Sequence, residues 1–321
     1  MSWNLRYFVL LWIGTVMLGN TNAQQMPLYS QYMMNGFVFN PAIAGADGFT
    51  TINLSARDHW VGLDNSPKTF VLSAQTRLYK TNFNFKPGNK PSKRSGRVGV
   101  GACVYNDRNG AINRTGGQIS YAYHISMQKT QLSMGLSVST FQVKIDQSQL
   151  QFFNQEPLLN SDFSSKVLVP DISVGGYLLS SNAFLGLSAD NLFQSRIKLG
   201  SEGYDYRMYR HYFLMGGKRF QEDQPFSYEP SFLLKATEKG AAQADLQLRG
   251  YYMHDYYIGL SYRTGTAVGI LLGAKWRRAY FGYAFDYTLS GLQKSTLGSQ
   301  EINITLKLGD NARRYRWMIR Y

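Results

Sequence analysis

Charged residues at alternating positions of short, strand-like segments are the side chains most able to do chemistry. Neighbours on a strand point to opposite faces, so these residues share a face opposite the apolar one. Two interpretations are open: the charges pair and stiffen a narrow interior, or they line a passage for a solute. The residues are Arg57, Arg77, Arg97, Lys235, Asp245, Arg249, Arg263, Lys275 and Asp286.

No grouping of residues indicates catalysis or a metal site. The four histidines are scattered without the spacing of metal ligands. Gly99-Val100-Gly101 lacks the third glycine and the helix of a dinucleotide site. A Gly-x-Ser-x-Gly nucleophile motif does not occur, and no carboxylate pair stands in a cleft-like context. We therefore expect no enzymatic activity, no cofactor and no metal.

The segments that carry these charges alternate with a period of two. Tyr256–Arg263, 267–275 and 281–288 each place apolar and aromatic residues on one face and small, polar or charged residues on the other. Leu132–Val138 alternates most cleanly, with serine and glycine between the apolar positions. We expect Leu136 to face lipid and Ser137 to face an interior. Each segment is about ten residues long, as a tilted membrane-spanning strand requires.

Repeated along the chain, this pattern predicts an all-β fold: a transmembrane antiparallel β-barrel of about fourteen strands over residues 49–309. The chain has 23 Tyr, 19 Phe and 31 Gly but only 17% charged residues, which suits aromatic girdles around a glycine-rich lumen. The single cysteine, Cys103, alternates in phase with Gly99 and Gly101 and is expected in the lumen.

Both ends of the chain depart from the alternation. Residues 1–23 have the basic start, apolar core and small-residue end of a signal peptide cleaved after Ala23. Residues 24–48 are irregular and carry Pro, Asn and Gly, which indicates a plug or an element at the periplasmic mouth. Residues 310–321 form a basic tail.

With both ends of the barrel in the periplasm, the long connections 144–170, 190–206 and 290–298 would lie on the cell surface. The turns 127–130, 253–255 and 276–278, the basic connection 80–97 and the tail would lie in the periplasm. The net charge of +14 needs a partner of opposite sign. Export makes nucleic acid an unlikely partner, which leaves anionic lipid headgroups and an acidic protein.

Short motifs within residues 24–48 resemble the N-terminal signature of the PorP/SprF family of type IX secretion. They are Pro27, Tyr29-Ser30-Gln31-Tyr32-Met33, Asn35 and Asn40-Pro41-Ala42-x-Ala44-Gly45. Further matches, such as Trp60-Val61-Gly62, Asn191-Leu192-Phe193 and Asp286-Tyr287, extend the resemblance over most of the mature chain. One departure is Gln300, where the family usually has His before Glu301.

The resemblance implies an integral outer-membrane barrel without enzymatic activity. It would help export or anchor a surface protein, such as a gliding or adhesion filament, through the C-terminal secretion domain of that protein. It would also connect periplasmic type IX machinery and peptidoglycan-linked components to the outer membrane. The alternative is a transporter of small apolar solutes, similar to fatty-acid channels, which would need a wide, weakly charged lumen.

The candidate residues for plugging or partner binding lie in the irregular segment and in the tail. We expect the segment to fold into or across the periplasmic mouth, with the basic connection and the tail beside it. The candidates are Tyr29, Ser30, Gln31, Tyr32, Asn35, Asn40, Pro41, Ala42, Gly45, Arg313, Arg314 and Arg316.

Overall fold

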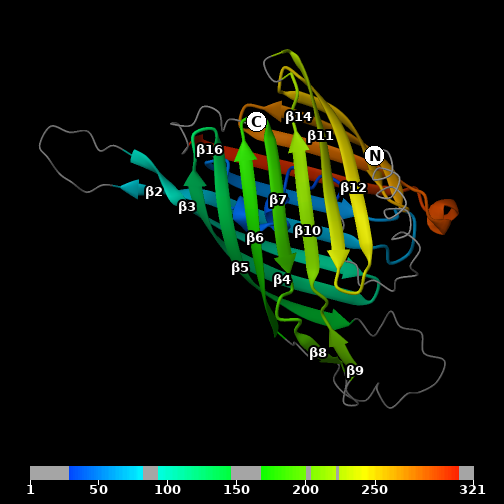
Figure 1. The fold of residues 1–321 in the computed structure, drawn as a ribbon. Helices are drawn as coiled ribbons and strands as arrows, with labels where there is room; N and C mark the ends of the chain where they lie inside the picture. Colours follow the sequence, from blue (N-terminus) through cyan, green and yellow to red (C-terminus); the bar gives the residue numbers. More distant parts are fainter. Residues whose placement is uncertain (1–28, 82–92, 146–167, 200–203, 222–223, 311–321) are drawn as a thin grey trace, which may run out of the picture.

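A closed antiparallel barrel makes up most of the molecule, and an irregular segment fills its lumen (Figure 1). The computed structural model describes residues 29–81, 93–145, 168–199, 204–221 and 224–310. The predicted signal peptide and the tail residues Arg313, Arg314 and Arg316 lie outside the described residues. Fourteen strands close the barrel, and the first pairs with the last. The predicted fold class is therefore confirmed.

Each barrel strand pairs with its neighbour along the chain. In order they are β1 (Phe49–Asp58), β2 (Lys68–Thr81), β3 (Lys93–Asn109), β4 (Ile112–Ser126), β5 (Thr130–Ile145), β6 (Leu168–Ser180), β7 (Ala183–Asp190), β10 (His211–Lys218), β11 (Phe226–Thr237), β12 (Ala242–Tyr252), β13 (Tyr256–Arg263), β14 (Ala267–Trp276), β15 (Ala279–Thr288) and β16 (Ser299–Asp310).

The two faces of the strands are those that the alternation predicts. Leu136 is 46% exposed on the outer wall, whereas its neighbour Ser137 is 1% exposed inside. Cys103 is buried on the inner face. A one-residue shift of register would exchange the two faces of a strand, so the match at Leu136 and Ser137 fixes the register there.

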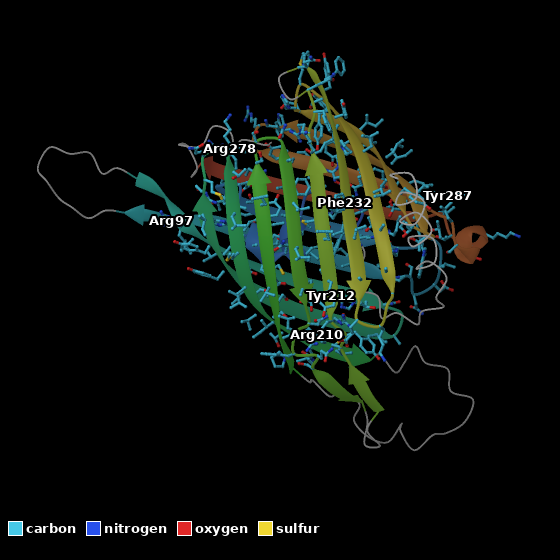
Figure 2. The ribbon with its side chains drawn as sticks, in the orientation of Figure 1. Arg97, Arg210, Tyr212, Phe232, Arg278 and Tyr287 are labelled. Atoms are coloured by element: carbon cyan, nitrogen blue, oxygen red, sulfur yellow. The ribbon has the colours of Figure 1, made fainter. Side chains whose placement is uncertain are left out.

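The two ends of the barrel differ. We call the end where β16 finishes the tail end; it carries the short turns 127–129, 253–255 and 277–278. The opposite loop end carries the longer connections 191–210 and 289–298. The grouping of connections by side agrees with the prediction. Figure 2 labels Arg278 at the tail end and Arg210 at the loop end.

Exposed aromatic side chains lie on the outer wall near both ends. Tyr252, Tyr256 and Trp276 are close to the tail end, and Tyr212 and Tyr287 are close to the loop end. Rings of this kind mark the two interfaces of a bilayer. The span between them corresponds to the membrane.

Three details differ from the sequence-based expectations. The predicted loop 190–206 contains a small sheet outside the barrel, β8 (Arg196–Leu199) paired with β9 (Tyr204–Arg207). The strand expected from residue 207 begins at His211. Both ends of the predicted connection 80–97 are strand, because β2 and β3 stay paired as far as Thr81 and Lys93 after a register shift near Arg77. Residues 82–92 lie outside the described part.

Three short 3₁₀ turns complete the described structure: η1 (Gly36–Val38), η2 (Pro41–Ile43) and η5 (Gly291–Ser295). None of the helices in the described residues is both long and apolar enough to cross a bilayer.

The orientation of the barrel in the membrane stays a prediction. We expect a cysteine in place of Lys239, in the exposed turn between β11 and β12, to react with a membrane-impermeant maleimide on intact cells in a Cys103→Ala background. A cysteine in place of Arg278 should react only after the outer membrane is disrupted, because that turn is at the tail end. The opposite labelling pattern would reverse the orientation.

Candidate functional site

Residues 29–48, which we call the plug, lie inside the barrel; thirteen of the twenty are buried and none is fully exposed. Of the nine candidate residues in this segment, only Asn35 is partly exposed. The plug does more than cover the tail-end mouth. Its first described residues reach a charge cluster in the half of the lumen near the loop end, and the segment then returns to the tail end to begin β1.

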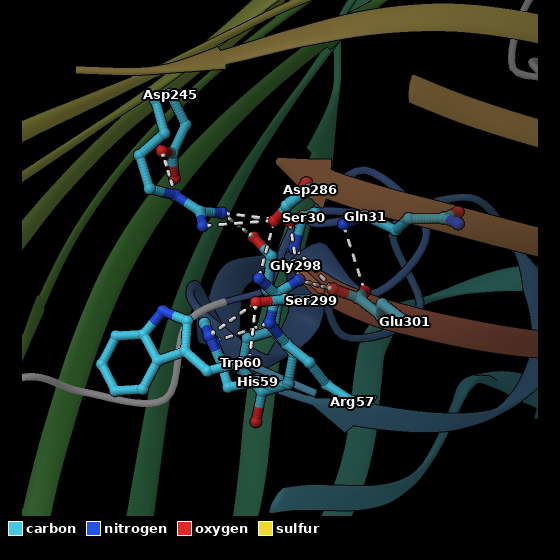
Figure 3. A network of polar contacts seen from close by, with 12 residues as sticks. Ser30, Gln31, Arg57, His59, Trp60, Asp245, Asp286, Gly298, Ser299 and Glu301 are labelled. Atoms are coloured by element: carbon cyan, nitrogen blue, oxygen red, sulfur yellow. Dashed lines mark hydrogen bonds and ion pairs between the residues drawn. The ribbon is translucent and has the colours of Figure 1, made fainter. Parts of the chain in front are cut away.

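The charge cluster joins side chains from six strands and the plug, and Figure 3 shows its central part. The Arg57 guanidinium contacts Asp286 at 2.7 Å and Glu301 at 2.8 Å. Arg263 bridges Asp245 at 2.8 Å and Asp286 at 3.4 Å. The ammonium group of Lys235 lies 2.7 Å from Asp245. Three basic and three acidic side chains therefore balance one another.

Strand pairing places these partners. Arg57 is directly opposite Glu301 across the β1–β16 pair, and Asp245 is directly opposite Arg263 across β12–β13. Asp286 faces Gly269 on β14, where a Cβ atom would lie 2.4 Å from a carboxylate oxygen of Asp286. The missing side chain at Gly269 makes room for the carboxylate between Arg57 and Arg263.

Ser30 of the plug lies at the centre of the cluster. Its hydroxyl donates to Asp286 and accepts from Arg57 at 2.7 Å and from Arg263 at 3.2 Å. A serine hydroxyl has one donor and two acceptor sites, so all of them are used. The Ser30 amide donates to Glu301 at 2.6 Å, and the Ser30 carbonyl accepts from Gln247.

The neighbours of Ser30 are held by the same groups. The Gln31 amide donates to Glu301 at 3.1 Å, and the Tyr29 carbonyl accepts from Arg263 at 3.3 Å. Irregular backbone at membrane depth is tolerated only when protein satisfies its polar groups. The cluster supplies those partners, so it fixes the start of the plug inside the lumen.

Asn40 and Pro41 hold the middle of the plug. The Asn40 side-chain oxygen accepts from the Ala42 amide at 2.9 Å and caps η2, and Pro41 occupies the first position of that turn. The Asn40 side-chain nitrogen donates to the Gly176 carbonyl on β6 at 3.0 Å. A single side chain thus shapes the turn and ties it to the barrel wall.

The last part of the plug is anchored by polar side chains near the tail end. The Ala46 carbonyl accepts from Gln131 at 3.1 Å and from Arg77 at 3.3 Å. A ring nitrogen of His124 lies 3.0 Å from the Ala44 carbonyl. Gly45 adopts a φ of +68° there, and its amide donates to Gln75 at 3.1 Å.

Glycines on the inner wall form the seats for the plug backbone. A Cβ atom at Gly99 would lie 1.9 Å from the Ala44 carbonyl oxygen, and one at Gly135 would lie 2.2 Å from the Ala42 nitrogen. A Cβ atom at Gly175 would lie 2.1 Å from the Asn40 side-chain oxygen. The glycine-rich lumen inferred from composition is therefore shaped to the plug.

Aromatic packing fills the space between these polar contacts. Tyr29 packs edge-on against Phe39, and Phe39 against Phe213 of β10. The Tyr32 hydroxyl donates to Ser231 at 3.2 Å. Burial raises the pKa of Tyr29 and of Tyr32, so both phenols stay protonated. The inward-facing Phe213 and its neighbours Met215 and Leu233 were not singled out in the sequence, because they break the polar character of the inner face.

Five of the nine charged residues predicted for the lumen follow the pairing interpretation: Arg57, Lys235, Asp245, Arg263 and Asp286. Arg77 and Arg249 are buried in the lumen, where they bond to Gln131 and Gln247. Lys275 lies at the tail-end rim and pairs with Asp255 at 3.4 Å. The assignment of Arg97 to the lumen is wrong. Its side chain is exposed near the register shift of the β2–β3 pair and donates to the outward-facing Tyr123.

The adjacent residues Gln300 and Glu301 lie on opposite faces of β16, and this difference decides which of them joins the charge cluster. Gln300, the departure from the family pattern, is exposed on the outer face and has no place in the cluster. Glu301 was not selected from the sequence, although it binds Arg57, Ser30 and Gln31. The alternation of β16 was the available signal, since Glu301, Asn303 and Thr305 share the inward phase.

The described residues contain no cluster of three or more His, Cys, Asp or Glu side chains that could hold a metal ion.

Comparison with known proteins identifies the family. The sequence pattern described as "Type IX secretion system membrane protein PorP/SprF" matches residues 21–306. The chain belongs to the PorP/SprF family. It is therefore an integral outer-membrane barrel component of type IX secretion, as the family and the closed barrel together indicate.

Other comparisons give only distant likenesses. A search of curated proteins finds no match. The outer membrane protein Omp33 of Acinetobacter baumannii is 6% identical, with a TM-score of 0.45, and the match covers 82% of this chain and 99% of that one. The Ralstonia pickettii toluene transporter TbuX is 11% identical, with a TM-score of 0.43, and the match covers 85% of this chain and 93% of that one.

The glycine seats yield a prediction with an adjacent control. Gly175→Ala places a Cβ atom against Asn40, whereas a Cβ atom at Gly176 meets nothing within 4 Å. We expect Gly175→Ala to displace the middle of the plug and to increase ion conductance through the barrel in planar bilayers, and Gly176→Ala to leave both unchanged. Equal conductance of the two variants would show that the seat at Gly175 does not hold the plug.

A second pair of adjacent residues tests the charge cluster. Glu301→Ala leaves Arg57 with one carboxylate partner fewer and two plug amides unbonded, so the free energy of unfolding should fall by about 3–5 kcal/mol. Gln300→Ala, on the outer face, should change it by no more than about 0.5 kcal/mol. Urea titration of the barrel folded in vesicles measures both. Similar values for the two variants would contradict a structural role for the cluster.

Proposed function

We propose that this PorP/SprF protein is a non-enzymatic partner of exported cargo. It supports the export or surface anchoring of a protein such as a gliding or adhesion filament. It recognises the C-terminal secretion domain of that cargo and links periplasmic machinery or peptidoglycan-linked components to the outer membrane. Its tail end faces the periplasm, and residues 1–23 are removed as a signal peptide.

The occupied lumen is the observation that carries this proposal. A solute channel needs a continuous passage, but here the plug is fastened by the charge cluster at Ser30, by Asn40 in the middle and by Ala46 near the tail end. The balanced cluster also leaves no excess charge in that part of the lumen to attract an ion. A barrel with its lumen occupied in this way suits a docking component better than a channel.

The burial of the plug residues favours a structural role for them. Tyr29, Ser30, Gln31, Tyr32 and Asn40 cannot touch a partner while the plug is in place. In this proposal the plug makes the barrel rigid and closes it. The parts that meet partners are then the exposed surfaces at the two ends, together with the basic tail.

Surface display of cargo tests the proposal directly. We expect deletion of the gene to abolish display of its cargo, detected by an impermeant biotin reagent on intact cells. Reversing the charges of Arg313, Arg314 and Arg316 should reduce display at unchanged barrel levels, because the tail then repels an acidic partner. Reversal of three exposed basic residues at the loop end, Arg108, Lys239 and Lys294, is the matched control.

The plug variant Asn40→Ala with Pro41→Ala separates this proposal from its alternative, a fatty-acid-channel-like transporter of small apolar solutes. We expect cells with this variant, in which the plug is loosened, to become permeable to small solutes. Cells with the wild-type protein should show no such permeability. A deletion strain that displays all cargo normally but loses uptake of an apolar solute would overturn the secretion role.

A further inference from the structure

Two small recesses open at the tail end of the barrel, on either side of Met33 and Met34 of the plug. The first, of about 100 Å³, lies between the plug and the inward-facing Phe184 and Met215. The second, of about 70 Å³, lies at the rim. Both are lined by Met33, Met34 and Lys307. Met33 and Met34 are two of the seven partly exposed residues of the plug.

The walls of the recesses are mostly apolar and aromatic. Tyr177 and Leu179 extend the first recess, and Tyr251, Tyr257 and Tyr280 surround the second. Methionine side chains adapt their shape to irregular partners and are common at surfaces that accept varied apolar groups. Small-molecule sites usually measure about 300–1,000 Å³. Each of these recesses is smaller and fits a single side chain.

The rim of the tail end is predominantly basic. Lys275 and Lys307 line the recesses, and their partners Asp255 and Asp47 are the carboxylates that line them. Arg249 lies in the second recess, its guanidinium 5.3 Å from the centre of the Tyr257 ring. The exposed Arg277 and Arg278 add further positive charge in the turn between β14 and β15.

Lysine side chains also frame the aromatic walls. The Lys307 ammonium lies 5.4 Å from the centre of the Tyr280 ring, and that of Lys275 lies 5.6 Å from the same ring. The Lys307 amide donates to the Arg278 carbonyl at 2.9 Å, which ties the turn to the last strand. The basic rim and the recesses are therefore parts of one ordered surface.

We infer that this surface binds an acidic peptide segment of a partner protein, with one apolar side chain of the segment in each recess. Interfaces of this kind combine a few buried apolar anchors with complementary charge around them. The inference rests on the proposed function for the identity of the partner as a component of the secretion machinery. The chemistry of the segment follows from the recesses and the rim.

A peptide fits better than a lipid. Acyl chains lie against the outer wall of a barrel, whereas the first recess is lined by inward-facing side chains and by the plug. Its volume suits an amino-acid side chain and falls well short of an acyl chain. Anionic lipid is the occupant that the experiment must separate from a peptide.

Binding of a defined probe tests the inference. The full-length protein is placed in nanodiscs of zwitterionic phosphatidylcholine and titrated with a fluorescent twelve-residue peptide of Asp and Glu that carries two leucines. We expect saturable binding that weakens as salt is added. Replacing the leucines with serine should weaken binding by about tenfold, because the apolar anchors are lost.

Charge variants provide the matched comparison. Arg277→Glu with Arg278→Glu should weaken binding by about tenfold or more, whereas Lys239→Glu with Lys294→Glu makes the same change of charge at the loop end and should have no effect. Both pairs are exposed, so folding is preserved. If the two pairs weaken binding equally, the peptide responds only to the net charge of the protein, and the inference of a specific binding surface fails.

Two further outcomes decide the matter. If binding of the acidic peptide is the same with serine as with leucine, the recesses are not used and the inference fails. If the acidic peptide does not bind in phosphatidylcholine nanodiscs, and a fluorescent phosphatidylglycerol binds the wild-type protein but not Arg277→Glu with Arg278→Glu, the surface is a lipid site and the inference fails. Neither result bears on the loss of cargo display in a deletion strain, so failure here is distinguishable from failure of the proposed function.

Discussion

The constraint on which the rest of the structure depends is the hydrogen bonding of a non-helical, non-strand segment at membrane depth. Each amide and carbonyl of such a segment needs a protein partner, because hydrocarbon offers none. The barrel meets this need with carboxylates and guanidinium groups around Ser30, with the Ser188 hydroxyl at the Phe39 carbonyl and with the Gln131 and Arg77 side chains at the Ala46 carbonyl. The inward-facing charges and the glycines are both consequences of housing the plug.

The buried charges also illustrate why a neutral cluster is tolerable. Removing a single ion from water costs several kcal/mol, and one partner rarely offsets that cost. Here Asp286 contacts two guanidinium groups as well as the Ser30 hydroxyl, so charge and hydrogen bonding are satisfied together. The cluster stabilises one position of the plug among the many that a flexible segment could adopt.

The number of strands and the faces of the wall could be predicted from sequence, because the period of two is a local pattern, as Leu136 and Ser137 show. The exposure of Arg97 could not, because it depends on a register shift between β2 and β3 that no local pattern records. The partners of Ser30 could not be predicted either, because Arg57, Asp286 and Glu301 come together only when the barrel closes. The high glycine content was evident from the sequence, but the contact of Gly135 with the plug backbone is evident only from the folded structure.

The contact between Ser30 and Glu301 spans 271 residues of chain. It joins a segment that precedes the first strand to the strand that completes the cylinder. Glu301 also lies directly opposite Arg57 in the β1–β16 pair that closes the barrel. Neither the plug nor the barrel can therefore reach its final form until the whole chain has been synthesised and delivered. A chain that ends before β16 lacks both the β1–β16 pair and the Glu301 contact of the plug, so only a full-length chain can form a closed and plugged barrel.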